Sequence, residues 1–437
     1  MRRADTFVLI SHPGAAHFIY ELVAAVQRLG FASLFETGYY YSDKGVLSDL
    51  LWLLPRSWRE RIERQLKRRQ FPDLDERFIQ QHARRELAYV ATARLFPHRP
   101  QLAERMLYRR NRYFDLVVAK RILFARHRPK LVVAHDTSGV VTIRTARSLG
   151  AVAVLNQVIG HIVVGDRILR EEAERHPEWA DSLHAGAPTW LIEQCQSEAL
   201  EADHILAPSD YVKDTLIEIG VAPERVHILP FGVRLDRFRP PETPKRSDGK
   251  LRLLYVGQIS QRKGLKYLLE AVRRLDDPSI ELTLVGGMVG SGAGLKPYEG
   301  WFRHVPNVPH HEVQRLFQQA DLFVYPSLHE GSANAIFEAM ATGLPVVTTR
   351  NSGSMVREGQ EGHIVPIRDP DALASCIAAL RDDPTRRAEL GENARWRSYD
   401  FTWDRYRVDL GTLLDRMLEE NLAPHARGPI VRPEGYA

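Results

Sequence analysis

The sequence predicts an α/β protein built from two Rossmann-like domains. Its 437 residues exceed the size of about 250–300 residues at which a single hydrophobic core stops growing. In both halves, short apolar runs typical of buried parallel strands alternate with amphipathic helical spacing. The stretch RPPETPKRSDGK at residues 239–250 is rich in proline and charge, and it separates the two series. We therefore expect it to be the linker.

The amino-acid composition limits the classes of protein to which the chain can belong. A hydrophobic content of 44% with 26% charged residues is typical of a globular protein, and no run reaches the roughly 18 apolar residues of a membrane span. A net charge of +5 is small for this length and does not favour a nucleic-acid partner. The first residues lack the apolar core of a secretory signal, and Cys195 and Cys376 form no metal-ligand pattern. We expect a cytoplasmic protein without a metal site.

The first predicted strand, residues 7–10, leads into the loop SHPGAAH and an amphipathic helix that ends at Gly30. The loop lacks the G-x-G-x-x-G pattern, which disfavours a dinucleotide site. Gly14 would instead let the backbone approach a ligand closely. His17, at the start of the helix, either lines that site or is a half-buried structural histidine, and the sequence leaves both readings open.

Residues from 41 to about 115 interrupt the alternation of strands and helices, and they are mostly helical and basic. Within Leu50–Arg69, two leucine pairs flank a tryptophan, and the following residues 56–69 hold seven Arg or Lys against two Glu. Trp58, Ile62 and Leu66 recur at intervals of four. An apolar stripe beside an arginine-rich face is typical of a helix lying on anionic lipid. The alternative is a stripe packed on the domain, with its arginines solvated.

Two further strands of this half are predicted at residues 131–134 and 151–155. The first ends in His135 and Asp136, and the carboxyl ends of parallel strands are where such domains place ligand sites. Asp136 is a candidate base for an acceptor hydroxyl, or it caps the loop. Ser209 is the expected N-cap of a helix at residues 211–219, and residues 226–233 close the domain.

The second half opens with a strand at residues 251–256 and the turn GQISQRKG. Two glycines that bracket a basic pair after a strand favour a phosphate-binding turn, with Lys263 as a point charge on a diphosphate. The alternative is a solvated lysine beside a turn glycine.

The stretch from 322 to 349, LFVYPSLHEGSANAIFEAMATGLPVVTT, carries the strongest functional signal. It reads as strand, polar turn, helix and second strand. Small residues at the start of the helix leave its first N–H groups free for an anion such as a diphosphate. Glu330 and Glu338 bracket that site, and because a carboxylate repels phosphate, we expect them to accept hydrogen bonds from sugar or ribose hydroxyls. Together these features outline a nucleotide-sugar.

The pattern E-x7-E followed by AMATGLPVVTT resembles the donor-site signature of the family 4 glycosyltransferases. The resemblance implies the GT-B fold, two Rossmann-like domains facing across a cleft, with a C-terminal helix crossing back to the first domain. The acceptor-binding domain would comprise residues 1–238 and 404–437, with the basic insertion at about 41–115. The nucleotide-sugar-binding domain would comprise residues 251–403.

The same resemblance implies roles for individual residues. Glu338 would bind the ribose, Glu330 the transferred sugar, and His135 would reach the reaction centre, so that His135, Glu330 and Lys263 are the catalytic candidates. Gln258 replaces an arginine usual in the family, so either the phosphate site has one cation fewer or Arg262 stands in for it. The diphosphate would be held by Gly14, Arg262, Lys263, Gly331, Ser332, Ala333 and Asn334, with His17, Asp136 and Gln258 as additional candidates.

The expected function is retaining, metal-independent transfer of a sugar from a UDP- or GDP-linked donor to a hydroxyl of a glycan or lipid-linked acceptor. The nucleotide-sugar is a co-substrate, and no other cofactor is expected. Such a reaction belongs to cell-surface polysaccharide or glycolipid synthesis, at the inner face of a membrane. Three alternatives stay open: an epimerase of the same fold, a phosphorylase, for which no pyridoxal lysine is recognisable, and an inactive nucleotide-binding or scaffold subunit.

Overall fold

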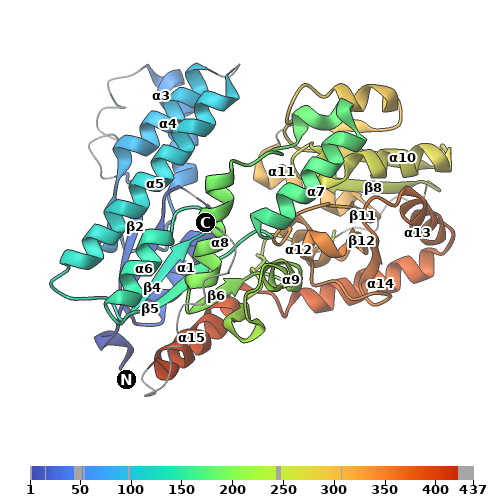
Figure 1. Ribbon diagram of the computed structural model, residues 1–437. Helices are drawn as coiled ribbons and strands as arrows, with labels where there is room; N and C mark the ends of the chain where they lie inside the picture. Colours follow the sequence, from blue (N-terminus) through green and yellow to red (C-terminus); the bar gives the residue numbers. More distant parts are fainter. Residues whose placement is uncertain are drawn as a thin grey trace. The chain divides into compact units, whose positions relative to one another are not determined.

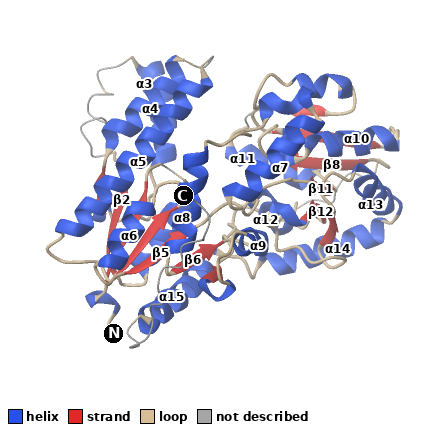
Figure 2. Ribbon diagram, viewed as in Figure 1, coloured by secondary structure: helices blue, strands red, loops and turns tan. Residues whose placement is uncertain are grey.

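The computed structural model describes residues 2–14, 16–43, 52, 55–96, 99–242, 248–306 and 308–421. Strands and helices alternate along the chain. The strands form two parallel sheets, coloured red in Figure 2. Contacts divide the chain into two compact units. Unit 1 comprises Met1–Asn156, Glu193–Leu206 and Arg407–Ala437, and unit 2 comprises Gln157–Ile192 and Ala207–Tyr406. The predicted α/β class with two sheets is confirmed.

The first sheet has seven strands in the order β3-β2-β1-β4-β5-β6-β7. Its central strands β1, β4 and β5 are apolar and almost wholly buried, which explains their continuous hydrophobic runs. The strands are β1 Phe7–His12, β2 Ala32–Thr37, β3 Ile79–Gln81, β4 Leu131–His135, β5 Val152–Asn156, β6 His204–Ala207 and β7 Val226–Ile228.

The helices that accompany this series include the predicted basic insertion. That insertion also contains the short edge strand β3, which pairs with β2 and which the sequence did not predict. The helices are α1 His17–Arg28, α3 Arg56–Leu66, α4 Ala83–Leu95, α5 Pro100–Phe124, α6 Val140–Ser148, α7 Ile162–Arg175, α8 Thr189–Glu201 and α9 Asp210–Glu218. The Ser209 hydroxyl accepts the N–H of Val212 at 3.3 Å, so the predicted N-cap of α9 is confirmed.

The second sheet has six strands in the order β10-β9-β8-β11-β12-β13. Figure 1 labels β8, β11 and β12 of this sheet. They are β8 Leu251–Val256, β9 Ile280–Val285, β10 Arg303–Val305, β11 Leu322–Tyr325, β12 Val346–Thr349 and β13 Gly362–Val365. The helices are α10 Leu265–Leu275, α11 His310–Gln319, α12 Asn334–Ala341, α13 Pro370–Asp382 and α14 Pro384–Ser398. Because β8 and β11 are neighbours in the sheet, the turns that follow them leave the same edge.

The last helix, α15 Trp403–Glu420, begins in unit 2 and from Arg407 belongs to unit 1. Leu410, Leu414 and Met417 on its predicted apolar face are fully buried. Arg3 near the amino terminus donates two hydrogen bonds to Asp415, at 2.6 and 3.3 Å. This agrees with the expected return of the last helix to the first domain.

The contact-based division differs from the predicted boundaries, because it places in unit 2 both residues 207–238, which include β7, and the segment 157–192. The sequence placed them in the first domain, 1–238, because they follow its strands directly. In the structure Val164, Ile168 and Trp179 from this segment lie in the same buried cluster as the strands of the second sheet. Apolar burial therefore assigns the segment to unit 2, although β6 and β7 after it still extend the first sheet.

Three predicted features fall partly or wholly outside the described residues. These are the middle of the linker, the part of the predicted stretch 404–437 beyond residue 421, and most of the hydrophobic start of Leu50–Arg69. No described helix has the length and apolarity needed to cross a membrane.

Candidate functional site

The turns after β8 and β11 lie against each other. The N–H of Leu328 donates to the carbonyl of Arg262 at 2.9 Å, and the hydroxyl of Ser327 donates to the same oxygen at 3.3 Å. Gly264 has a φ of +71°, and a side chain there would also overlap the carbonyl oxygen of Pro326. The glycine of the predicted Lys-Gly pair is thus required for the two turns to meet.

The basic pair and the first glutamate converge at this junction. Arg262 and Lys263 belong to the short 3-10 helix η6, Gln261–Lys263, and both form ion pairs with Glu330. Arg262 Nη1 lies 3.3 Å from Glu330 Oε2 and donates to the carbonyl of His329 at 2.9 Å. The residues predicted to bind a diphosphate and a sugar are therefore in direct contact.

Aromatic rings line one side of the Lys263 amine. The Lys263 amine lies 5.4 Å from the centre of the Tyr325 ring, which stacks on Tyr255 at 5.3 Å between centroids. Burial and the neighbouring Arg262 lower the pKa of Lys263, whereas contact with the Glu330 carboxylate favours its charged form. A cation in such a poorly hydrated position interacts with an incoming anion more strongly than an exposed one does.

The start of α12 is less open than the sequence predicted. The N–H of Ala333 donates to the carbonyl of Ser352 at 3.2 Å, and the N–H of Gly331 lies 3.3 Å from Glu330 Oε1. The expectation of free N–H groups is therefore wrong at these two positions. Ser332, Asn334 and Ala335 have N–H groups with no acceptor among the described residues.

Gly331 and Ser332 are placed by packing. A side chain at Gly331 would overlap the backbone of Val158, so this glycine is needed whether or not a ligand approaches it. Ser332 is buried, and its hydroxyl finds no hydrogen-bond partner in the described part of the chain.

Glu338 is half-buried one turn into α12. Its carboxyl forms no hydrogen bond or ion pair with another described residue. Burial raises the pKa of Glu338 to about 8, and the positive charge of Arg237 opposes that shift. When it is ionised, this carboxyl group can accept hydrogen bonds from both hydroxyls of a diol, because no described residue occupies its oxygens.

In unit 1, His135 and Asp136 lie at the end of β4, as predicted. His135 Nε2 is 2.8 Å from Asp136 Oδ1, and His135 Nδ1 is buried without a partner in the described part of the chain. The ring of His12 lies 4.3 Å from that of His135, between centroids. Sequence reasoning missed His12, although its position at the end of β1, the neighbour of β4, was a usable signal.

A buried carboxylate shapes the loop after β4. Glu198 accepts the N–H of Thr137 at 2.7 Å and that of Gly139 at 2.8 Å. Thr137 has a φ of +67°, which is unfavourable for a β-branched residue, and these bonds hold it there. Burial raises the pKa of Glu198 to about 8. Nothing in the sequence indicated this contact, because Glu198 lies on a helix far from the loop in the chain.

Comparison with known families accounts for this arrangement. Residues 77–237 match the model of "Glycosyltransferase Family 4", and residues 250–383 match that of "Glycosyl transferases group 1". Together these matches cover well over half of the chain. The chain belongs to the family 4 glycosyltransferases.

Individual relatives agree with this assignment. The D-inositol 3-phosphate glycosyltransferase 2 of Catenulispora acidiphila is 32% identical over 244 residues, which cover 50% of this chain and 57% of that protein. The putative colanic acid biosynthesis glycosyltransferase WcaL of Escherichia coli is 28% identical over 320 residues, covering 66% of this chain and 71% of that protein.

The structural comparison concerns the fold. HepE of Anabaena, solved in complex with UDP and glucose, superposes with a TM-score of 0.59 at 15% identity, covering 94% of this chain and all (100%) of that one. This likeness shows the GT-B fold that the sequence predicted.

Of the remaining candidates, His17 and Gly14 belong to unit 1 and Gln258 belongs to unit 2. The side chain of His17 is 56% exposed and lies 3.8 Å from Glu21. Gln258 is exposed, and its carbonyl accepts the Tyr255 hydroxyl at 2.7 Å. Gly14 adjoins His12 and Arg110, which a side chain at this position would touch at 3.5 and 3.6 Å.

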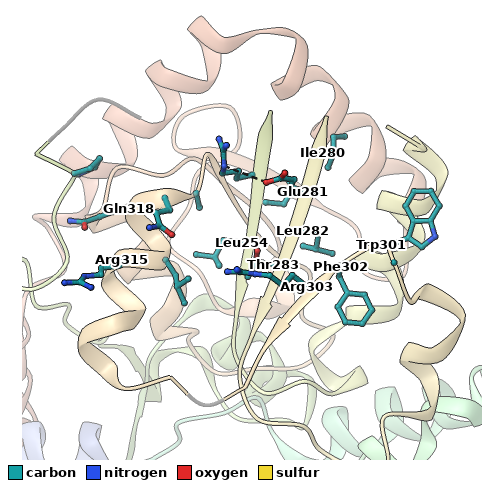
Figure 3. A pocket seen from close by; sticks show the side chains of 17 residues that line it. Leu254, Ile280, Glu281, Leu282, Thr283, Trp301, Phe302, Arg303, Arg315 and Gln318 are labelled. Atoms are coloured by element: carbon teal, nitrogen blue, oxygen red, sulfur yellow. Dashed lines mark ion pairs between the residues drawn. The ribbon is translucent and has the colours of Figure 1, made fainter. Parts of the chain in front are cut away.

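A cavity of about 800 Å³ opens on one face of the second sheet (Figure 3). Thr283 and Arg303 form its floor, Arg315 of α11 stands on one side, and Trp301 and Phe302 stand on the other. The lining also includes Arg252 near the start of β8 and Ile280 at the start of β9, and Arg303 is the first residue of β10, whereas the basic turn follows the end of β8. The cavity is therefore separate from the candidate site.

Among the described residues, no group of three or more His, Cys, Asp or Glu side chains is arranged to hold a metal ion.

Proposed function

We propose that the protein is a retaining glycosyltransferase that moves a sugar from a nucleotide-diphosphate sugar to a hydroxyl of a glycan or lipid-linked acceptor. Colanic acid synthesis by the relative WcaL, as its name states, supports a role in cell-surface polysaccharide or glycolipid synthesis. The UDP bound by HepE supports a uridine or similar nucleotide. The donor is a co-substrate, and no other cofactor is proposed.

One observation carries the proposal: Arg262, Lys263 and Glu330 converge beside a helix whose Glu338 has no partner among the described residues. The cations offer a diphosphate two positive charges, and the carboxylates offer hydroxyl groups an acceptor. The E-x7-E signature of the family contains Glu330 and Glu338, and the same resemblance makes Lys263 a catalytic candidate.

In the proposed reaction, the bond between the anomeric carbon and the diphosphate oxygen breaks, and the acceptor oxygen forms the new bond on the same face of the sugar. Lys263 and Arg262 stabilise the negative charge that develops on the leaving diphosphate. An oxygen of that diphosphate takes the proton of the acceptor hydroxyl. His135 is proposed to contribute to turnover rather than to nucleotide binding.

A panel of nucleotide-sugars tests this proposal. Each UDP- and GDP-sugar is first scored by its effect on thermal unfolding, because a ligand that binds only the folded state raises its stability. Those that bind are then assayed for release of nucleoside diphosphate with and without acceptor extracts. Release that depends on an acceptor, with retained anomeric configuration and undiminished by a chelator, is the expected result.

Other outcomes of the panel would favour the alternatives. Conversion of the donor sugar without release of diphosphate would identify an epimerase. Phosphate-dependent cleavage of a glycan would identify a phosphorylase, and binding without turnover would indicate an inactive subunit. Stability that no member of the panel changes would overturn the proposed donor site.

An anionic membrane surface is proposed as a further partner, through the basic helix of the insertion. Trp52 and Trp58 are 71% and 67% exposed, and the Arg59 guanidinium lies 4.2 Å from the centre of the Trp52 ring. Exposed tryptophans beside arginines suit the boundary between headgroups and acyl chains. The protein is expected to sediment with vesicles that contain anionic lipid, and less so with neutral vesicles or when both tryptophans are replaced by serine. Equal sedimentation in all cases would contradict this role.

A further inference from the structure

Residues 158–182, which comprise α7 and the 3-10 helix η4 (Pro177–Ser182), contact both turns of the candidate site. Helix α7, labelled in Figure 1, shares unit 2 with β8 and α10, and its Glu172 accepts a hydrogen bond from Tyr267 of α10. Trp179 is buried, and a side chain on Gly294 would run into its ring. The segment is thus anchored in the second sheet's own core.

On the basic side, the segment holds the first residue of η6. Gln261 is fully buried, and its N–H donates to the hydroxyl of Ser182 at 3.0 Å. Its side-chain amide donates to Glu172 Oε1 at 2.7 Å and accepts the N–H of Lys266 at 2.9 Å. A 3-10 helix of three residues has little stability of its own. The position of the following Arg262 and Lys263 therefore depends on Glu172 and Ser182.

Glu172 is itself held firmly. Its carboxylate is fully buried and accepts hydrogen bonds from Gln261, from the Tyr267 hydroxyl at 2.8 Å and from Arg368 Nε at 2.8 Å. Arg368 has a φ of +63° and also donates to Glu171 at 2.8 Å. Three donors from three different segments hold this buried carboxylate in place, so it can fix the position of the turn.

On the acidic side, the segment seats the residue before Glu330. The His329 ring packs against Gly160 and Gly165, where an added side chain would approach it to 2.6 and 2.5 Å. Its Nδ1 lies 2.7 Å from the Tyr211 hydroxyl, and burial lowers the pKa of His329 to about 3, so the ring is neutral. The N–H of Gly160 donates to the carbonyl of Glu330 at 3.2 Å.

We propose that residues 158–182 act as a positioning brace for the donor site: Glu172 and Ser182 fix the basic turn through Gln261, and Gly160 and Gly165 fix Glu330 through His329. This inference rests on the proposed function of that site. The brace residues need not touch substrate, and they act by setting the distance between the cations and the carboxylate. A displacement of about 1 Å in such a site costs up to about 100-fold in rate.

Glu172→Gln tests the basic side of the brace. The substituted amide places an N–H₂ group against either Gln261 or Arg368, both of which are donors, so one of these hydrogen bonds is lost and the other is no longer charge-assisted, which weakens the hold on the turn. We expect at least a tenfold weaker affinity for UDP or GDP, whichever the wild type binds, measured by calorimetry below the unfolding transition of both proteins. Glu171→Gln is the matched control, because it removes an ion pair of the same arginine without touching the turn.

Gly165→Ala tests the acidic side. Alanine favours a helix over glycine by roughly 1 kcal/mol, so α7 itself gains stability, while the new methyl group displaces His329. We expect a modest fall in the midpoint of thermal unfolding, because the gain in helix propensity offsets only part of the cost of displacing the packed ring, together with at least a tenfold lower kcat measured well below that midpoint. A purely structural role predicts no change in kcat once the protein is folded.

The outcomes separate the two proposals. If the wild type binds neither UDP nor GDP, the proposed function fails. If it binds one, and Glu172→Gln binds it equally well or Glu171→Gln weakens it equally, the basic side of the brace is overturned. Full kcat in Gly165→Ala would overturn the acidic side.

Discussion

At the scale of single residues, Glu338 links nucleotide binding to pH. Burial raises the pKa of Glu338 to about 8. A carboxylate accepts two hydrogen bonds from a ribose diol, whereas the protonated acid must spend one oxygen as a donor. Binding is therefore expected to release a proton, so affinity for a nucleotide-sugar should rise between pH 6 and 8 and then level off.

Glu338→Gln is the matched variant for this prediction. It keeps one carbonyl acceptor and cannot titrate, so we expect weaker binding that no longer changes over this pH range. Calorimetry in buffers of different ionisation enthalpy measures the released proton directly. Identical pH profiles for wild type and variant would remove Glu338 from the ribose site.

Lys263 is expected to act mainly in turnover. Lys263→Met keeps the length of the side chain but removes the charge that faces the leaving diphosphate. Loss of one preorganised electrostatic group typically costs about 100- to 1000-fold in kcat. Lys266→Met serves as the control, since only the backbone N–H of Lys266 is engaged by the turn. A similar loss in both variants would contradict a specific role for Lys263.

Sequence reasoning located the functional candidates in both turns, but for some of them it predicted the wrong structural role. Glu330, Lys263 and Glu338 occur at fixed spacing within short motifs, so a single chain reveals them. Gly331 was interpreted as leaving room for phosphate, yet it faces the backbone of Val158. Glu198 and Glu172 were not singled out, because a buried carboxylate that binds backbone or amide donors from distant elements leaves no local pattern.

At the scale of elements, Gly264 is expected to be indispensable for the junction of the two turns. Gly264→Ala combines a positive φ with overlap of the Pro326 carbonyl, whereas Gly300→Ala has a φ of +94° and open space around it. The left-handed conformation costs about 1–2 kcal/mol for an ordinary residue. We expect that cost alone for Gly300→Ala, and a larger cost together with lost nucleotide affinity for Gly264→Ala.

Thermal unfolding and calorimetry of the two variants measure these effects. Equal destabilisation of both, with nucleotide affinity retained, would show that the turns tolerate separation and that the glycine serves only its own conformation.

The predicted elements matched the structure closely where burial is continuous. The strands β8 and β11 begin and end at the predicted residues, because each is an apolar run bounded by polar turns. The domain to which residues 157–192 belong could not be predicted from apolar runs of this kind. Their amphipathic pattern shows that one face is buried but does not identify the core against which it packs.

At the scale of the whole molecule, two buried acids make stability dependent on pH. Glu198 in unit 1 and Glu338 in unit 2 each have a pKa raised to about 8, above the value of about 4.5 from which burial shifts them. The folded state therefore binds more protons than the unfolded state between these values. Their contribution to stability is fully present below pH 4.5 and is lost as the pH rises through 8.

We therefore expect the midpoint of thermal unfolding of the ligand-free protein to fall between pH 6 and 9. Glu338→Gln should flatten this dependence in part, since it removes one of the two titrations and no hydrogen bond within the described chain, leaving the contribution of Glu198. Because two units need not unfold together, intrinsic fluorescence and calorimetry are compared at each pH. A midpoint that rises over this range, or a variant with the same dependence as the wild type, would mean that other groups dominate and that Glu338 is ionised in the folded protein at neutral pH.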